Sequence, residues 1–162
     1  MSVFVAMGQT LATYCGQNYG AGKYTRIQSG MKVGTIITCS WCAVVFVIVY
    51  LLAPILTEFI TGSHDQDMIQ AASGYLKVDC ILYFLVALIF VLRNSLQGIG
   101  DRVTPLISSG IEMVGKIVFT YTLVPALGYT GVILVEPIVW IIMIIPLILK
   151  MKKVMRLEQW QN

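Results

Sequence analysis

The feature that most constrains this chain is a run of 25 residues, 33–57, that contains no charged side chain. An α-helix rises about 1.5 Å per residue, so about 20 apolar residues cross the roughly 30 Å hydrocarbon core of a bilayer. Pro54 stands near the end of the run, where a transmembrane helix tolerates it because neighbouring groups satisfy the freed backbone carbonyl. The run therefore predicts a membrane-spanning helix.

The composition excludes a soluble fold. Of the 162 residues, 57% are hydrophobic and only 12% are charged, and the mean hydropathy is +0.82, whereas a soluble domain carries about 25% charged residues. The net charge of +3 is too small to indicate a nucleic-acid-binding protein. The first fifteen residues also lack the basic start and cleavage pattern of a secretory signal peptide. We therefore expect the chain to contact the lipid bilayer and no nucleic acid.

The remaining apolar segments predict an all-α, polytopic transmembrane helix bundle with one partial and four full helices. Residues 16–30 contain four glycines and two basic residues, which indicates a break after a short first segment. Glu58 to Met68 is a polar connection with no Lys or Arg. We expect spans at about 1–15 (partial), 33–57, 75–98, 103–124 and 132–149, followed by a basic tail at 150–162.

The basic residues indicate which ends of these spans face the cytoplasm, because cytoplasmic loops collect Lys and Arg. The loops at 58–74 and 125–131 contain neither residue. The other ends hold eight: Lys23, Arg26, Lys32, Arg102, Lys150, Lys152, Lys153 and Arg156. The pattern predicts a multi-pass protein of the cell (plasma) membrane with a cytoplasmic C-terminus.

The short first segment must then enter from the outer side. Fifteen helical residues rise only about 22 Å, less than the hydrocarbon core. We expect that an upstream part of the protein has been lost, and the alternative is a re-entrant or interfacial piece.

The glycine-rich break resembles a motif of the multidrug and toxic compound extrusion (MATE) family. In that family a helix ends in a Gly-Gln pair, followed by a Gly-Ala-Gly-Lys turn and an Arg before the next helix. The corresponding residues here are Gly16, Gln17, Gly20, Ala21, Gly22, Lys23 and Arg26. Two further stretches look similar to the family, LRNSLQGIGDRVTPLI at 92–107 and LGYTGVILVEPIVW at 127–140.

The resemblance implies a fold and an activity. Family members have twelve helices in two six-helix lobes, and the helix count and sidedness of this chain match the end of the second lobe. The family exports drugs and organic cations in exchange for inward Na⁺ or H⁺. The resemblance therefore implies part of a cation-coupled multidrug efflux antiporter with no cofactor, whose coupling ion, H⁺ or Na⁺, stays open.

Ionisable residues inside the spans are the candidates for the transport path, because burying a charge in hydrocarbon is costly. They are Asp79, Arg93, Glu112, Lys116 and Glu136. Glu112 and Lys116 stand four residues apart with the acid first, so they can pair on one helix face, as a structural pair or as part of the path.

The other candidates have similar alternatives. Asp79 follows Lys77, and the two form an interfacial pair or Asp79 binds a cation or proton. Arg93 extends to the cytoplasmic interface or partners Glu112. Glu136 faces water at interface level, or is a titratable site beside Pro137.

Several other patterns indicate no function. The resemblance implies that sodium-coupled family members carry an acid at a register that falls near Val86. Because Val86 is apolar, Na⁺ coupling through this lobe is in doubt. Cys39 and Cys42 lie inside an apolar run without a second cysteine pair, so we expect small packing residues. His64 lies among acids in a loop without further ligands, so we expect no metal site. We find no catalytic motif and expect no enzyme.

Two further hypotheses remain from the sequence. One is a flippase of related two-lobe fold that exports lipid-linked precursors, which usually lines its cavity with several arginines, whereas only Arg93 lies within a span here. The other is a non-transporting membrane protein, either an accessory partner or a remnant.

We expect that this chain alone does not transport, because alternating access needs a cavity between two lobes. Purified chain in liposomes should show no ethidium efflux when a proton or sodium gradient is applied, as followed by ethidium fluorescence. Efflux above that of protein-free liposomes would contradict this expectation.

Overall fold

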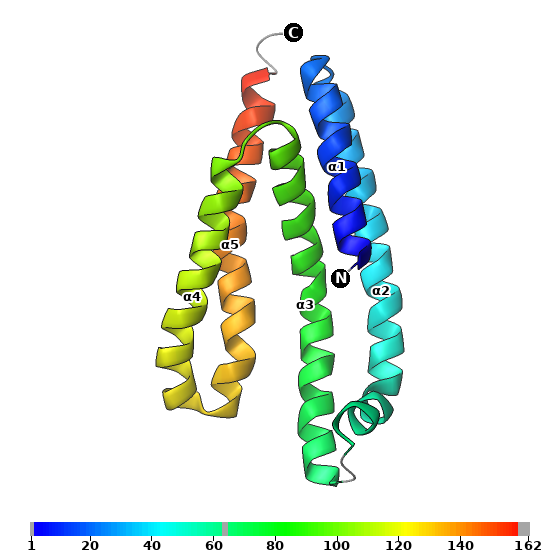
Figure 1. The fold of residues 1–162 in the computed structure, drawn as a ribbon, viewed down its shortest axis with the longest axis vertical. Helices are drawn as coiled ribbons and strands as arrows, with labels where there is room; N and C mark the ends of the chain where they lie inside the picture. The colour runs from blue at the N-terminus through cyan, green and yellow to red at the C-terminus, as the bar shows by residue number, and fades with distance from the viewer. Residues whose placement is uncertain (1, 63–64, 159–162) are drawn as a thin grey trace.

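The computed structural model describes residues 2–62 and 65–158, which form five α-helices (Figure 1). His64 and the last four residues of the predicted basic tail lie outside the described residues. No strand occurs within the described ranges, so the predicted all-α class is confirmed. The helices are α1 (Ser2–Gly20), α2 (Tyr24–Thr61), α3 (Gln66–Gly98), α4 (Val103–Leu127) and α5 (Tyr129–Glu158).

Four of the described helices are long and apolar enough to cross a membrane. These segments are Tyr24–Thr61, Ala72–Gly98, Val103–Leu127 and Tyr129–Arg156. Their outer faces carry exposed large hydrophobic side chains, among them Phe59, Leu106 and Tyr121, which are 86%, 72% and 79% exposed. Such faces are compatible with lipid and not with water. The chain is therefore a multi-pass membrane protein that contacts the lipid bilayer.

The helices extend beyond the predicted spans. The break expected over residues 16–30 is confined to Ala21–Lys23, and the described part of the basic tail continues α5 up to Glu158. In a helix the backbone groups bond to one another within the same segment. The helix can therefore continue through polar residues beyond the end of an apolar span. Where the bilayer begins and ends along these helices stays a prediction.

Helix α3 is the centre of the bundle. It packs against α1 and α2 on one side and against α5 on the other, while α4 packs mainly on α5. The main core lies between α3 and α5 in the half nearer the α3–α4 turn. Its buried members are Ile89, Leu92, Leu96, Met143, Ile144, Leu147 and Met151. A second cluster, Phe4, Cys42 and Ala87, joins α1, α2 and α3, so Cys42 is a packing residue as predicted.

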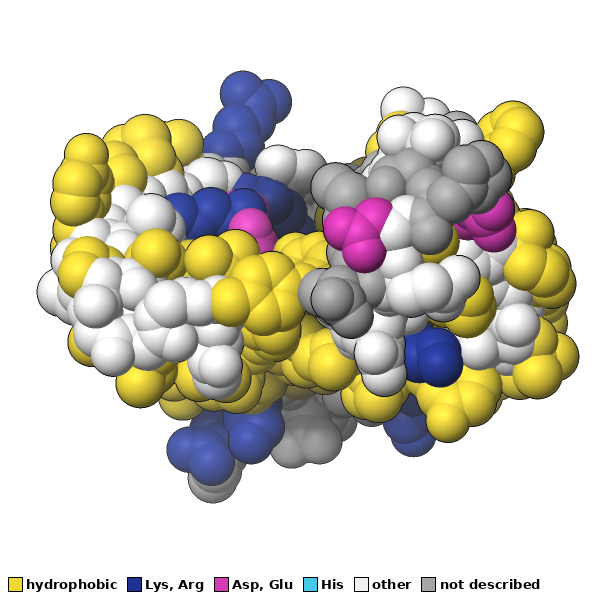
Figure 2. Space-filling view, turned by 90° about the horizontal axis from the view of Figure 1, so that it is seen from below, with side chains coloured by type: hydrophobic (Ala, Val, Ile, Leu, Met, Phe, Trp, Pro, Cys, Tyr) yellow, Lys and Arg dark blue, Asp and Glu magenta, His cyan; other side chains and the backbone are white. Residues whose placement is uncertain are grey.

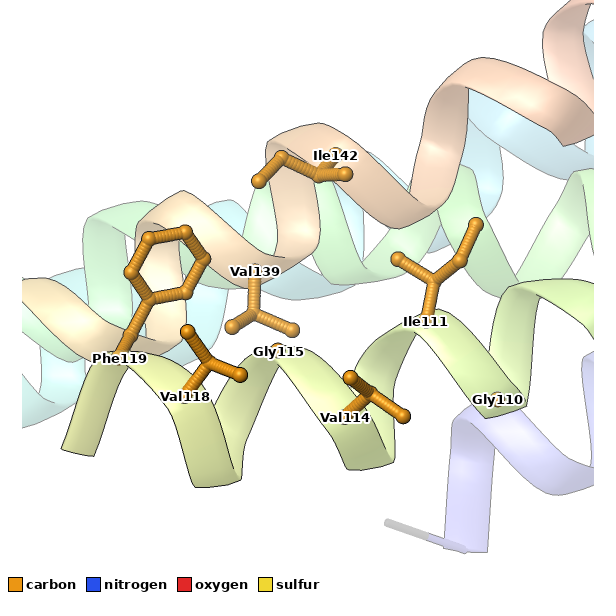
Figure 3. Close-up of a pocket in the computed structure, with 8 residues that line it drawn as sticks. All are labelled: Gly110, Ile111, Val114, Gly115, Val118, Phe119, Val139 and Ile142. Atoms are coloured by element: carbon orange, nitrogen blue, oxygen red, sulfur yellow. The ribbon is translucent and has the colours of Figure 1, made fainter. Parts of the chain in front are cut away.

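Small residues let neighbouring backbones approach closely. A Cβ atom on Gly16 of α1 would lie 2.7 Å from the carbonyl oxygen of Gly98, and one on Gly98 would overlap the backbone of Ala12. On the other side of the bundle, Gly115 of α4 faces Val139 of α5 (Figure 3). Ser108 of α4 also donates a hydrogen bond of 2.9 Å to the carbonyl of Met143. Close contacts of this kind hold helices together in lipid, where no hydrophobic effect does so.

The α1–α2 turn, which carries the family motif, is closed by its own backbone. Gly22 has φ of +67°, a left-handed conformation that favours glycine. Its N–H donates to Tyr19 at 3.0 Å, and the N–H of Lys23 donates to Asn18 at 2.8 Å. This pair of bonds is a Schellman motif, which satisfies the last carbonyls of a helix. The motif residues Gly16, Gln17 and Gly20 are helical.

The α3–α4 turn repeats this geometry. Gly100 has φ of +91°, its N–H donates to Gln97 at 3.1 Å, and the N–H of Asp101 donates to Leu96 at 3.0 Å. The Asp101 carboxylate then accepts hydrogen bonds from the backbone N–H groups of Val103 and Thr104, both at 3.1 Å, and so caps α4. Lys150 of α5 lies 3.4 Å from the same carboxylate.

The electrostatics of Asp101 follow from these contacts. Partial burial would raise its pKa, but the hydrogen bonds from Thr104 and the ammonium of Lys150 outweigh burial, so its pKa lies below the ordinary value of 3.8. The carboxylate therefore stabilises the fold above that pH and loses this effect as the pH falls through its lowered pKa.

Replacing Gly98 by Ala should separate α1 from α3. We expect Gly98→Ala to lower the free energy of unfolding by about 1–3 kcal/mol, because the added methyl group overlaps the Ala12 backbone. Gly74→Ala on the same helix is the control, since nothing lies within 4 Å of the added atom. Denaturant unfolding in detergent measures both variants, and equal stability of the two would contradict the close approach of α1 and α3.

Removing the Asp101 carboxylate should destabilise the α3–α4 turn in a pH-dependent way. We expect Asp101→Ala to lower the free energy of unfolding by about 1 kcal/mol at neutral pH, the usual effect of a lost cap. The difference from the unmodified chain should shrink well below pH 3.8, where both lack the charge. Unfolding curves at both pH values give the comparison, with Lys152→Ala as an exposed control. A difference that persists in acid would show that the carboxylate charge is not the cause.

Candidate functional site

A cavity of about 420 Å³ lies between α3, α4 and α5. Helices α3 and α4 touch little beyond their turn, so they diverge and leave a space that α5 closes on one side. Viewed from the α4–α5 end, acidic and basic side chains lie together in a recess surrounded by hydrophobic side chains (Figure 2). All five candidates for the transport path line this cavity: Asp79, Arg93, Glu112, Lys116 and Glu136. Their role in transport stays a prediction.

Helical periodicity explains why these residues share one space. Tyr75, Asp79 and Tyr83 follow one another at four-residue intervals on α3, and Arg93 continues the same face. Glu112 and Lys116 have the same spacing on α4, and Glu136 and Trp140 have it on α5. Each of the three helices therefore presents at least one charged side chain to the cavity.

Lys116 lies between two carboxylates. Its Nζ atom is 3.2 Å from Oε1 of Glu112 on the same helix and 3.1 Å from Oε1 of Glu136 on α5. The Glu112–Lys116 spacing indicated the first pair, but the bridge to Glu136 was not predicted. The sequence did contain a signal for this bridge, since Lys116 and Glu136 are opposite charges within two helices that a short turn joins.

Glu136 lines the cavity, and its depth in the bilayer stays a prediction. Its Oε1 atom is paired with Lys116, whereas its Oε2 atom is buried and has no hydrogen-bond partner among the described residues. A buried carboxylate oxygen without a partner is costly, so this atom is available to a further donor or cation.

Asp79 also points into the cavity. Its carboxylate interacts with the hydroxyl of Tyr83, one turn further along α3, and lies near enough to Glu136 for the two charges to repel. The Lys77–Asp79 pair considered from the sequence is wrong, because residues two apart on a helix point in different directions. The ammonium of Lys77 lies instead over the ring of Tyr50, 4.8 Å from its centre.

Arg93 joins α3 to the first part of α4. Its guanidinium donates to the hydroxyl of Ser109 and, at 3.5 Å, to the carbonyl of Pro105. It contacts these groups and not Glu112, whose described ion pair is with Lys116. Arg93 therefore contributes a positive charge to the cavity without neutralising one of its acids.

Aromatic and apolar side chains complete the cavity wall. Tyr75, Tyr83, Phe90 and Trp140 line it, and aromatic faces attract cations. The sequence did not lead us to predict these residues, although Tyr75, Tyr83 and Trp140 each stand four residues from Asp79 or Glu136. Val86 also lines the cavity and is 8% exposed, so an apolar side chain stands where the family resemblance led us to expect the acid of a sodium-coupled protein.

The remaining sequence candidates lie elsewhere. The family-motif residues, which run from Gly16 to Arg26, belong to the α1–α2 turn and its flanking helices, and none lines the cavity. Cys39, Cys42 and Cys80 are free thiols on α2 and α3, of which Cys42 and Cys80 are buried and Cys39 is half-buried. No cluster of three His, Cys, Asp or Glu side chains suited to a metal occurs in the part of the chain that the structure describes.

Comparisons with known proteins agree with the motif and the fold. The MatE family model matches residues 1–122. The protein DETOXIFICATION 28 of Arabidopsis thaliana is 31% identical over 147 residues, which cover 86% of this chain. The chain spans only 28% of the length of that relative. No solved structure matches the chain.

Proposed function

This chain belongs to the MatE family of membrane transporters, which are not enzymes, and we propose that it forms part of an efflux antiporter for organic cations. The relative is named for detoxification, which is consistent with the export of xenobiotics. The observation that carries the proposal is the charged, aromatic-lined cavity within an otherwise apolar helix bundle.

The chemistry of the cavity suits a cation. When all its groups are ionised, the three carboxylates of Asp79, Glu112 and Glu136 exceed the two positive charges of Arg93 and Lys116. One net negative charge inside the bilayer attracts a positive ligand strongly, because the local dielectric constant is low. The aromatic wall adds cation–π attraction for an organic cation that has lost its water shell.

The coupling ion would act through the acids that repel each other. A proton or a sodium ion at Asp79 would relieve the repulsion between this carboxylate and Glu136. The apolar Val86 at the sodium-site register supports a proton over sodium. In the mechanism that we propose, the ion and the organic cation bias two arrangements of the bundle, so that the cavity opens to one side at a time.

The positions of the basic residues indicate how the bundle is oriented in the membrane. The α1–α2 turn, the α3–α4 turn and the end of α5 lie at one end of the bundle and carry Lys23, Arg102 and Arg156, among others. We propose that this end faces the cytoplasm and that the host membrane is the plasma membrane. Because the chain spans 28% of its relative's length, we propose that transport by the whole protein requires further helices.

A lipophilic cation should bind in the cavity, and an anion of the same shape should not. We expect tetraphenylphosphonium to bind the chain in lipid nanodiscs and tetraphenylborate to bind no better than to empty nanodiscs, since only the charge differs. Asp79→Asn should weaken tetraphenylphosphonium binding about tenfold, equivalent to about 1.4 kcal/mol. Isothermal titration calorimetry measures these affinities.

The control variant is Asp65→Asn, which removes an exposed acid at the end of the bundle and leaves the cavity intact. Its affinity for tetraphenylphosphonium should equal that of the unmodified chain. The proposed cation site would be overturned if the chain bound both tetraphenyl ions equally. It would also be overturned if Asp65→Asn lost as much affinity for tetraphenylphosphonium as Asp79→Asn.

A further inference from the structure

The position of Lys116 has a consequence for the cation site. Two acids of the cavity that we propose for a cation already have a cationic partner, because the ammonium of Lys116 lies 3.2 Å from Glu112 and 3.1 Å from Glu136. Its side chain is 39% exposed, so the ion pairs lie at the wall of the cavity and within reach of a ligand.

We propose that Lys116 is a tethered competitor of the transported cation: it occupies Glu112 and Glu136 when the cavity is empty and is displaced when the cation binds. The inference rests on the proposed function, since it requires that a cation enters the cavity. In this role Lys116 lowers the affinity of the site, because only a cation that binds strongly enough to displace the ammonium occupies it.

The charges of the cavity support displacement over simple addition. With Lys116 in place, two of the three acids share one ammonium group, and Asp79 is the acid without a described basic partner. If Lys116 moves away, Glu112 and Glu136 are released and the cation meets three carboxylates. The buried Oε2 atom of Glu136, which has no described partner, then also becomes part of the site.

The long, unbranched side chain of Lys makes this exchange feasible. An ammonium group on a flexible four-carbon stem can leave one pair of acids and reach another position without backbone movement. The other cation of the cavity lacks this freedom, because the guanidinium of Arg93 is held by Ser109 and the Pro105 carbonyl. The two positive charges therefore have different roles, one fixed and one exchangeable.

The bridge also links ligand binding to helix position. Lys116 connects α4 to α5 beside the contact of Gly115 with Val139, whereas α4 touches α3 little. Displacing the ammonium from Glu136 removes an attraction between α4 and α5 on the cavity side. Binding of the cation would thereby favour a different separation of these two helices.

Removal of the competitor should strengthen cation binding. We expect Lys116→Gln to bind tetraphenylphosphonium in nanodiscs about tenfold more tightly than the unmodified chain, a typical size for coupling between two binding events. Lys116→Arg keeps the charge and the pairing, so its affinity should stay close to that of the unmodified chain. Lys153→Gln removes an equal charge from the exposed end of α5 and should change nothing.

The outcomes separate this inference from the proposed function. If the unmodified chain binds tetraphenylphosphonium and Lys116→Gln binds it equally or more weakly, the inference is overturned and the cation site stands. An equal gain in Lys153→Gln would show a general effect of charge and would also overturn it. If neither the unmodified chain nor Lys116→Gln binds the probe, the proposed function fails, and the inference fails with it.

A second measurement needs no variant. Acetic anhydride modifies free amines, and mass spectrometry reports the extent at each lysine. Displacement predicts that tetraphenylphosphonium increases acetylation of Lys116 several-fold, while Lys153 serves as the internal reference. Unchanged or decreased acetylation of Lys116 at saturating probe would mean that the ammonium stays in place, and would overturn the inference.

Discussion

Charge inside hydrocarbon is the constraint on which the arrangement of α3, α4 and α5 depends. A Lys at the centre of a transmembrane helix is unfavourable unless acids neutralise it. Lys116 meets this requirement with one acid on its own helix and one on α5, at 3.2 and 3.1 Å. The pairing fixes which face of α4 turns towards α5, and the same rotation directs Glu112 into the space beside α3. The polar cavity and the position of α4 thus have a common cause.

The basic end of the bundle depends on a different requirement, the satisfaction of backbone groups where helices end. The turns after α1 and α3 use the same solution, with Gly22 and Gly100 in left-handed conformations and paired backbone hydrogen bonds. The family motif, on which the resemblance to the MATE family rests, is therefore a structural element of a turn and of helix packing. Gly16 belongs to it because the Gly98 carbonyl lies too close for a side chain.

The sequence predicted the helix class, the number of helices and the five ionisable residues of the cavity, since uncharged runs and isolated charges are local signals. It did not predict where helices end, because polar residues such as Gln17 and Lys150 occur both inside helices and in the loops that follow them. It also missed the bridge from Lys116 to Glu136 and the aromatic wall around Trp140. These depend on how separate helices rotate against each other, and that rotation results from packing between residues distant in the sequence.

The short turn between α4 and α5 has a consequence for biosynthesis. Lys116 and Glu136 lie on helices separated only by Gly128, whose N–H closes α4 by donating to Val124 at 2.9 Å. A single Lys or Asp at the centre of an inserting helix costs about 2.5–3.5 kcal/mol. If α5 left the translocon alone, Glu136 would enter the lipid without its partner, whereas Lys116 on α4 would still have Glu112 beside it. The Lys116–Glu136 ion pair therefore favours insertion of α4 and α5 into the bilayer together, as one hairpin.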